Sequence, residues 1–392
     1  MPLVTELHLK TLAEKACVQT GLTDFGDASW AEGCERLVDS LRHEAALSEL
    51  GEAVVEGELI GYLSDRLQLV AERSARPEIG TRAVVPPIVI IGQGRTGTTI
   101  LHDLLSEDPG TRVPLTWEVD HPNPPPETAT YDTDPRIAEV DATLEGVDIV
   151  LPGFRAMHPM GARLPQECVR ITASDFRSLI FATQYRVPSY TNWLTHEADM
   201  ASAYRWHRVF LQHLQSRCPG ERWVLKSPAH IWALPQLLAE YPDALLVQTH
   251  RDPLRIIASI GSLVARLRTI AAPETPIPDV SAEFAEYIVE GLERSVTARQ
   301  DGTVAPSRVI DVQFSEFMGD PFTTIRTVYE KLGLELTDVA EQRMRDHLAA
   351  NPQDKFGKHT YTWTATGLDE GEWRERTRRY SEYFAIPSED LG

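Results

Sequence analysis

Apolar residues recur at helical spacing in the first part of the chain, between Trp30 and about Arg73. Side chains three or four positions apart share one face of a helix, so this pattern predicts amphipathic helices. Gly51 interrupts the pattern and is expected to separate two helices. We therefore expect residues 1–84 to form an N-terminal helical extension. The pattern is carried by Leu37, Leu41, Ala45, Leu59, Leu63, Leu67 and Val70.

From residue 85 onwards, short apolar runs alternate with helical patterns. The run 87–92 (PIVIIG) has the length of a buried strand, and a helical pattern follows it from Thr98 to Ser106. Such alternation is typical of a mostly parallel sheet with helices on both faces, so an α/β domain is expected over 85–392. Further strands are expected at 222–226, 244–249 and 307–314, and further helices at 229–241, at 253–267, and from Pro321 and Asp338.

The region between the first predicted helix and the second predicted strand has a different pattern. Residues 121–135 (HPNPPPETATYDTDP) are rich in proline, and no regular element is predicted there. Residues 137–214 show helical patterns with polar breaks and no strand signal.

Charge and cysteine content narrow the possible partners and the compartment. The 392 residues carry a formal net charge of −20, which disfavours DNA, RNA and anionic surfaces as partners. The four cysteines form no Cys-x-x-Cys pair, and this favours a reduced compartment. The start of the chain has no apolar signal core, and the longest apolar run, 83–92, is too short to span a bilayer. We therefore expect a cytoplasmic protein without an integral membrane segment.

The glycine-rich loop from Gly92 to Thr99 fits two phosphate-binding patterns. Read as Gly-x-x-x-x-Gly-x-Thr, it has P-loop spacing, with Thr98 at the usual lysine position and a cation, Arg95, inside the loop. Read as Gly-x-Gly-x-x-Gly, it is a dinucleotide fingerprint, with Glu118 near the expected position of a ribose-binding acid. A nucleotide kinase and an NAD-dependent oxidoreductase are therefore both open alternatives at this point.

Residues 90–110 (IIGQGRTGTTILHDLLSEDPG) resemble the 5′-phosphosulfate loop of sulfotransferases that use 3′-phosphoadenosine 5′-phosphosulfate (PAPS). The similarity is strongest to the bacterial branch and to tyrosylprotein sulfotransferases, and it continues over roughly 85–385. It implies a P-loop-type sheet flanked by helices, and sulfuryl transfer from PAPS to a hydroxyl. The implied donor-binding residues in the loop are Gly94, Arg95, Thr96, Gly97, Thr98 and Thr99.

A second phosphate site is expected after the third predicted strand. Arg251 ends that strand, and Ser259 follows eight positions later on the next helix. In sulfotransferases an arginine and a serine at this separation bind the 3′-phosphate of PAPS, and a guanidinium suits phosphate oxygens. The run from His250 to Asp252 also imitates a kinase catalytic loop, but Ile257 occupies the position of the expected asparagine.

The resemblance also implies a transfer centre. Lys226 matches the family lysine that stabilises charge on the transferring group, and Arg95 would share this role. Glu118 is the expected general base, because its surroundings are similar to those of the catalytic glutamate in tyrosylprotein sulfotransferases. Pro228 stands where cytosolic members have a histidine, so His230 is a further candidate. His121 and His102 also remain open as bases.

Two further segments complete the expected site. Glu167 lies in a Pro-x-Glu segment that borders the acceptor pocket in bacterial relatives, and we expect it to contact the acceptor. Lys358 and His359 match in position a basic loop that closes over the nucleotide. Some of the aromatic residues on the helical stretch before residue 200 are expected to line an apolar acceptor cavity, and most to belong to the core. These aromatics are Phe176, Phe181, Tyr185, Tyr190 and Trp193.

Other chemistry has little support. The sequence contains neither a His-Glu-x-x-His helix nor a Gly-x-Ser-x-Gly elbow, and its cysteine and histidine spacings suggest no metal site. A non-catalytic module that binds the bisphosphate product remains an alternative. The expected acceptor is a small molecule, lipid or sugar, chosen by the helical region 130–215, and a homodimer is possible.

Overall fold

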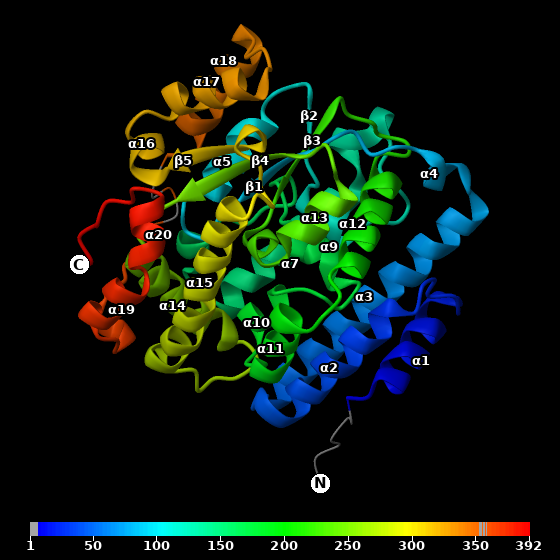
Figure 1. Ribbon diagram of the computed structural model, residues 1–392. Helices are drawn as coiled ribbons and strands as arrows, with labels where there is room; N and C mark the ends of the chain where they lie inside the picture. The colour runs from blue at the N-terminus through cyan, green and yellow to red at the C-terminus, as the bar shows by residue number, and fades with distance from the viewer. Residues whose placement is uncertain (1–6, 353–354, 356, 358) are drawn as a thin grey trace.

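A five-stranded parallel sheet forms the centre of the computed structural model, which describes residues 7–352, 355, 357 and 359–392. The strands stand in the order β2-β3-β1-β4-β5, so the strand that precedes the glycine loop lies in the middle (Figure 1). Ile88 of β1 pairs with Val224 of β3 on one side and with Leu245 of β4 on the other. The strands are β1 (Ile88–Ile91), β2 (Thr111–Arg112), β3 (Arg222–Lys226), β4 (Leu245–His250) and β5 (Val309–Gln313).

The predicted mostly parallel α/β fold is confirmed, and the reason is visible in β1. All four of its residues are buried, because successive side chains point to opposite faces of the sheet and helices cover both faces. Val89 and Ile91 pack with α12 (Ala201–Leu214) and α13 (Leu234–Glu240). Ile88 and Ile90 pack against the helices on the other face, namely α5 (Thr98–Ser106), α17 (Pro321–Leu332) and α18 (Asp338–Ala350).

The N-terminal helices share a core with a later part of the chain. Helices α1 (Leu9–Thr20), α2 (Ser29–Glu44) and α3 (Glu49–Ala75) bury their apolar faces against residues 173–194. The two predicted helices exist, but Gly51 lies in the first turn of α3 and does not separate them. Ser48 begins α3, where its hydroxyl accepts a hydrogen bond from the Gly51 amide at 3.1 Å.

Gly51 serves a packing role in place of the expected break. A Cβ at this position would lie 2.2 Å from the carbonyl oxygen of Ala271, so only glycine allows this close approach between α3 and the chain after α14 (Pro253–Arg268). The proposed division into 1–84 and 85–392 falls in the link between α4 (Glu78–Thr81) and β1, and it stays a prediction.

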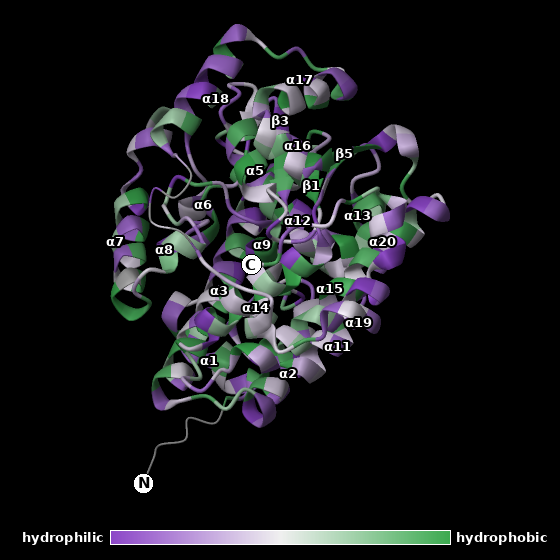
Figure 2. Cartoon of the chain, turned by 90° about the vertical axis from the view of Figure 1, so that its left-hand side faces the viewer, coloured by the Kyte–Doolittle hydropathy of each residue, from purple (hydrophilic) through white to green (hydrophobic). Residues whose placement is uncertain are grey.

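The helical region after the first strand–helix unit agrees with the expectation except at one point. Residues 121–135 contain a short 3-10 helix, η1 (Thr128–Thr133), which sequence pattern did not indicate. Figure 2 shows α7 and α8 at the outer edge of the molecule, near α6. The elements here are α6 (Thr116–Asp120), α7 (Pro135–Val150), α8 (Phe154–Met157), α9 (Cys168–Ala173), α10 (Ile180–Gln184) and α11 (Pro188–His196).

The predicted helix 229–241 is divided into a 3-10 turn, η2 (Pro228–Ala233), and α13. Within the residues described, no helix has both the length and the apolar composition to cross a bilayer. The remaining elements are α15 (Ile277–Gln300), η3 (Pro306–Arg308), α16 (Phe314–Gly319), η4 (Thr364–Thr366), α19 (Glu370–Arg376) and α20 (Arg378–Tyr383).

Candidate active site

The glycine loop lies at the carboxyl end of the central strand and is fixed against the neighbouring strand. A Cβ at Gly92 would lie 2.6 Å from the Thr249 carbonyl oxygen, so the loop begins in direct contact with β4. The Thr96 hydroxyl lies 2.6 Å from both the Gln93 carbonyl oxygen and the Thr249 hydroxyl. Gly97 has a φ of +90° and leads into α5. This strand–loop–helix geometry leaves amide groups at a helix start, as an anion site requires.

Arg95 connects the loop to the predicted second phosphate site. Its Nε donates a hydrogen bond to the Ser259 hydroxyl at 3.0 Å, and its Nη1 donates to the Met157 carbonyl oxygen at 3.0 Å. Burial lowers the pKa of Arg95, and the nearby Arg251 cation acts in the same direction. An anion placed between these two guanidinium groups would reduce both effects. The structure therefore brings Arg95, Ser259 and Arg251 together, and their predicted role in phosphate binding stays a prediction.

Arg251 is oriented by contacts on several sides. Its Nη1 donates to the Arg95 carbonyl oxygen at 3.0 Å, and its guanidinium lies 4.0 Å from the centre of the Phe314 ring. Its other nitrogens donate to both carboxylate oxygens of Glu389, with Nε–Oε1 at 2.9 Å and Nη2–Oε2 at 2.8 Å. This bidentate geometry is the one in which arginine binds carboxylates and phosphates. Arg251 thus binds a carboxylate, an oxyanion like phosphate, within its own chain.

Lys226 ends β3 with its side chain 2% exposed, and it forms an ion pair with Glu167. Its Nζ also lies 3.5 Å from the Thr99 hydroxyl at the start of α5. Glu167 is the N-terminal flanking residue of α9, and its side chain is 22% exposed. A buried lysine and a partly solvated carboxylate therefore meet beside the glycine loop. The sequence predicted both residues for the site but did not predict their contact.

Glu118 has its own buried set of partners, and their geometry argues against the predicted role as general base. Its carboxylate is fully buried and paired with both terminal nitrogens of Arg112. It also accepts hydrogen bonds from the Leu115 amide at 2.9 Å and the Tyr131 hydroxyl at 3.0 Å. Burial by itself would lower the pKa of Arg112, but Glu118 outweighs it and the net shift is upward. A carboxylate with these partners has no access to an acceptor proton.

The histidine candidates are likewise poorly placed to act as the base. Burial lowers the pKa of His102 to about 3, and its Nε2 lies 3.2 Å from the Val224 carbonyl oxygen within the core. His121 has an exposed side chain next to the proline-rich segment. Burial also lowers the pKa of His230 to about 3, and its Nδ1 lies 2.9 Å from the Tyr204 hydroxyl.

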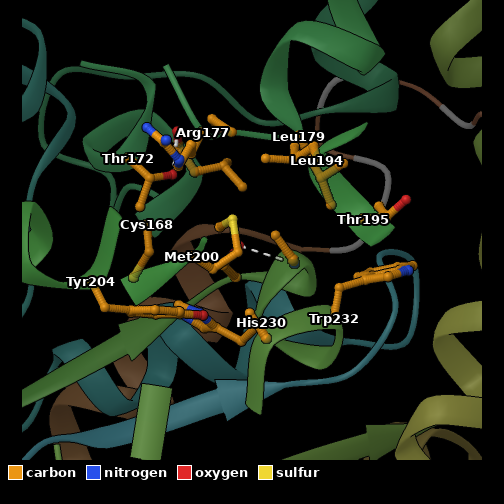
Figure 3. A pocket seen from close by; sticks show the side chains of 15 residues that line it. Cys168, Thr172, Arg177, Leu179, Leu194, Thr195, Met200, Tyr204, His230 and Trp232 are labelled. Atoms are coloured by element: carbon orange, nitrogen blue, oxygen red, sulfur yellow. Dashed lines mark hydrogen bonds between the residues drawn. The ribbon is translucent and has the colours of Figure 1, made fainter. Parts of the chain in front are cut away.

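His230 is one of the side chains that line a partly open pocket with a free volume of about 30 Å³ (Figure 3). The pocket is mainly apolar, with Met200 and Trp232 among its walls. Two lining residues, Cys168 and Ser227, directly follow Glu167 and Lys226 in the chain, so the pocket lies next to that ion pair. The five aromatics named from the sequence as possible pocket residues all belong to the core shared with the N-terminal helices and do not line this pocket. They are Phe176, Phe181, Tyr185, Tyr190 and Trp193.

The predicted closing loop contributes His359. Its Nε2 lies 3.0 Å from the hydroxyl of Ser262, one helical turn after Ser259 on α14. Burial, together with the charge of Arg95, lowers the pKa of His359 to about 4. Lys358, the other residue predicted for this loop, lies outside the described residues.

Sequence reasoning missed two contributions to the site. Burial lowers the pKa of His158, and the charges of Glu167 and Lys226 also act on it, so this histidine is close to the transfer centre. Glu389 reaches Arg251 from 138 positions away in the chain. Neither residue lies in a recognisable motif. Within the described parts of the chain, no group of three or more His, Cys, Asp or Glu side chains could hold a metal ion.

Comparison with known proteins agrees with this geometry. A model of the sulfotransferase family matches residues 86–338. The omega-hydroxy-beta-dihydromenaquinone-9 sulfotransferase Stf3 of Mycobacterium bovis is 26% identical over 305 residues, which cover 75% of each chain. The crystal structure of sulfotransferase STF9 from Mycobacterium avium matches with a TM-score of 0.88 and 30% identity over 99% of both chains. That of STF1 from Mycobacterium tuberculosis H37Rv matches with a TM-score of 0.84 and 31% identity, covering 95% of this chain and 98% of STF1.

Proposed function

The chain belongs to the sulfotransferase family, and from this premise we propose that it transfers the sulfuryl group of PAPS to a hydroxyl of an apolar acceptor. The observation that carries the proposal is the convergence of Arg95, Ser259 and Arg251 at the end of the glycine loop. PAPS has two separate anionic ends, and this chain offers two adjacent anion sites. The loop amides and α5 suit the 5′-phosphosulfate, and Arg251 with Ser259 suits the 3′-phosphate.

Three observations support this donor over the alternatives. Arg251 binds the Glu389 carboxylate with two nitrogens, so the chemistry and shape of this site fit an oxyanion. The dinucleotide interpretation requires Glu118 to bind a ribose, and that carboxylate is buried in its ion pair with Arg112. The nucleotide-kinase interpretation lacks the loop lysine, because Thr98 occupies that position.

The transfer itself needs a proton acceptor and cations that stabilise the leaving group. We assign the first role to Glu167, because its carboxylate is partly solvated and lies beside Lys226. As the acceptor oxygen forms its bond to sulfur, Glu167 takes the hydroxyl proton. The bond between sulfur and the bridging oxygen breaks, and the electron pair stays on the 5′-phosphate of the product. Lys226 and Arg95 stabilise the charge that develops there.

The proposed acceptor class rests mainly on one relative. The mostly apolar walls of the pocket lined by His230 agree with it, although a free volume of about 30 Å³ holds no more than about one water molecule. The name of Stf3 describes a hydroxylated menaquinone derivative, a lipid-like alcohol. We therefore favour a lipid or other apolar alcohol over a free sugar. The predictions of a cytoplasmic location and of a possible homodimer stay predictions.

Binding and turnover test the proposal separately. In calorimetric titrations without added metal, we expect adenosine 3′,5′-bisphosphate to bind with micromolar affinity and ATP and NAD to bind much more weakly. Arg251→Ala should weaken bisphosphate binding at least tenfold, whereas the matched surface variant Arg326→Ala should not change it. Tighter binding of NAD or ATP would refute the proposed donor. With labelled PAPS, faster sulfation of a free sugar than of a long-chain alcohol would refute the acceptor class.

A further inference from the structure

The last residues of the sequence place a carboxylate in the proposed 3′-phosphate site. Glu389 accepts hydrogen bonds from Arg251 through both of its oxygens, and Arg255 Nε lies 3.8 Å from Oε2. The Glu389 side chain is 28% exposed, and that of Arg251 is 11% exposed. A negatively charged group therefore already occupies the Arg251 guanidinium where the nucleotide phosphate is proposed to bind.

Specific backbone contacts hold Glu389 in this place. The Glu389 amide donates to Asp252 Oδ2 at 2.7 Å, so the chain is fixed directly beside Arg251. Asp252 is itself rigid, because it caps α14 through the Leu254 amide at 3.0 Å and both of its oxygens accept hydrogen bonds from Arg374. The contact is thus a defined interaction of the folded chain.

A second contact holds the segment a little further along. The Leu391 carbonyl oxygen accepts a hydrogen bond from the Trp363 amide at 3.3 Å, and Leu391 packs on the apolar cluster formed by α14 and α15. Trp363 follows the predicted closing loop, which carries His359. The segment that carries Glu389 therefore links the anion site to the loop expected to cover the nucleotide.

We infer that residues 387–392 are a built-in competitor of the nucleotide, with the Glu389 carboxylate bound to Arg251 where the 3′-phosphate would bind. The inference rests on the proposed function. One guanidinium edge cannot bind the carboxylate and a phosphate in the same geometry, and the two anions repel each other. Binding of a 3′-phosphorylated nucleotide must therefore displace Glu389 from Arg251 and release this segment.

This competition lowers the apparent affinity for the nucleotide. If only a fraction of molecules has the site open, the measured dissociation constant rises by the inverse of that fraction. The competition acts only on nucleotides that carry a 3′-phosphate, because a nucleotide without this group can bind the loop while Glu389 stays on Arg251. The segment would thus lower the affinity for the sulfuryl donor and its bisphosphate product and leave the affinity for 5′-nucleotides unchanged.

Calorimetry with adenosine 3′,5′-bisphosphate on wild type, Glu389→Gln and the matched control Asp390→Asn tests this inference. Glutamine removes the charge and keeps the size, so we expect Glu389→Gln to lower the dissociation constant about three- to tenfold. Asp390 pairs with the Gly392 amide and not with Arg251, so its variant should match wild type. If wild type binds normally and Glu389→Gln binds the bisphosphate equally well or more weakly, the inference that Glu389 competes with the nucleotide is wrong. If no protein binds the bisphosphate, the proposed function fails as well.

Hydrogen exchange on the wild-type protein provides an independent readout that needs no variant. We expect the amides of residues 387–392, including the Glu389 amide held by Asp252, to exchange faster when the bisphosphate is bound. Adenosine 5′-phosphate, which lacks the 3′-phosphate, should leave them protected at a concentration that saturates the loop. Protection that persists or increases with the bisphosphate would overturn the inference.

Discussion

Replacing Glu118 by glutamine tests whether this carboxylate serves the fold or the reaction. The substitution keeps the shape of the side chain but removes the charge that faces Arg112, whose side chain is only 7% exposed. Removing one partner of a buried ion pair costs about 3–5 kcal/mol, because the other charge stays buried without compensation. A protein of this kind has a free energy of unfolding of about 5–15 kcal/mol, so the loss is a large part of the total.

The assay compares the urea midpoint with the turnover of the folded protein. We expect Glu118→Gln to lower the midpoint strongly while the folded fraction keeps turnover within a few-fold of wild type at low temperature. Glu167→Gln, the matched control at the transfer centre, should lower turnover about 10²–10⁴-fold, as loss of a general base does. Its midpoint should also fall, because Lys226 is only 2% exposed and loses its partner, so turnover is compared per folded molecule.

A double variant separates ion-pair loss from general disruption of the core. Arg112→Met combined with Glu118→Leu removes both charges, and we expect it to recover most of the stability lost in Glu118→Gln. The reasoning would be refuted if Glu118→Gln kept its midpoint and lost turnover more than a hundredfold. That result would return the role of base to Glu118 and would require the ion pair with Arg112 to open during the reaction.

Three further predictions follow from the same geometry. Arg95→Ala and Lys226→Ala should each reduce turnover at least 10³-fold with an unchanged circular dichroism spectrum; near-normal turnover in either variant would exclude it from the transfer centre. Gly51→Ala should lower the free energy of unfolding by about 1–3 kcal/mol in urea titration, because the new Cβ would lie 2.2 Å from a backbone oxygen. The control Gly57→Ala in the same helix meets nothing within 4 Å and should raise the free energy of unfolding by about 0.5–1 kcal/mol. Equal effects of the two substitutions would contradict this packing. Burial lowers the pKa of His207 from 6.5 to about 3, so the unfolded chain binds more protons than the folded protein between these pH values. The free energy of unfolding should therefore fall as the pH drops through this window. A His207→Gln variant with the same dependence of stability on pH as wild type would disprove this contribution.

Elements with strong local signals could be predicted from the sequence. The run IVII is buried on both faces of the sheet and needs no distant information to be recognised as a strand. β2 could not be found in this way, because it has only two residues and exists through its pairing with β3. The sequence predicted a helix break at Gly51, because glycine often ends helices. In the structure, glycine is needed at this position because the backbone of Ala271, more than two hundred positions away, approaches it closely.

The candidate site shows the same difference between residues that the sequence could assign and residues whose contacts depend on the fold. Lys226 ends β3 and Arg251 directly follows β4, and the resemblance to sulfotransferases assigned both residues to the site together with Arg95 of the glycine loop. Glu118 was assigned from its local surroundings, which do not reveal that α6 turns its carboxylate into the core towards Arg112. Glu389 carries no sequence signal, because its contact depends on how the final residues return to the sheet.

The central place of β1 also has a consequence for synthesis of the chain. Both of its neighbours come much later, because Ile88 pairs with Val224 and Leu245. At about 5–20 residues per second, the ribosome completes the second neighbour roughly 10–30 s after β1 emerges. During that time an entirely apolar strand has no partner on either edge, which makes the nascent chain prone to aggregation. The helices that emerge first, α1 to α3, also lack their packing partners at 173–194 during this time, so two separate apolar surfaces of the nascent chain wait for later residues.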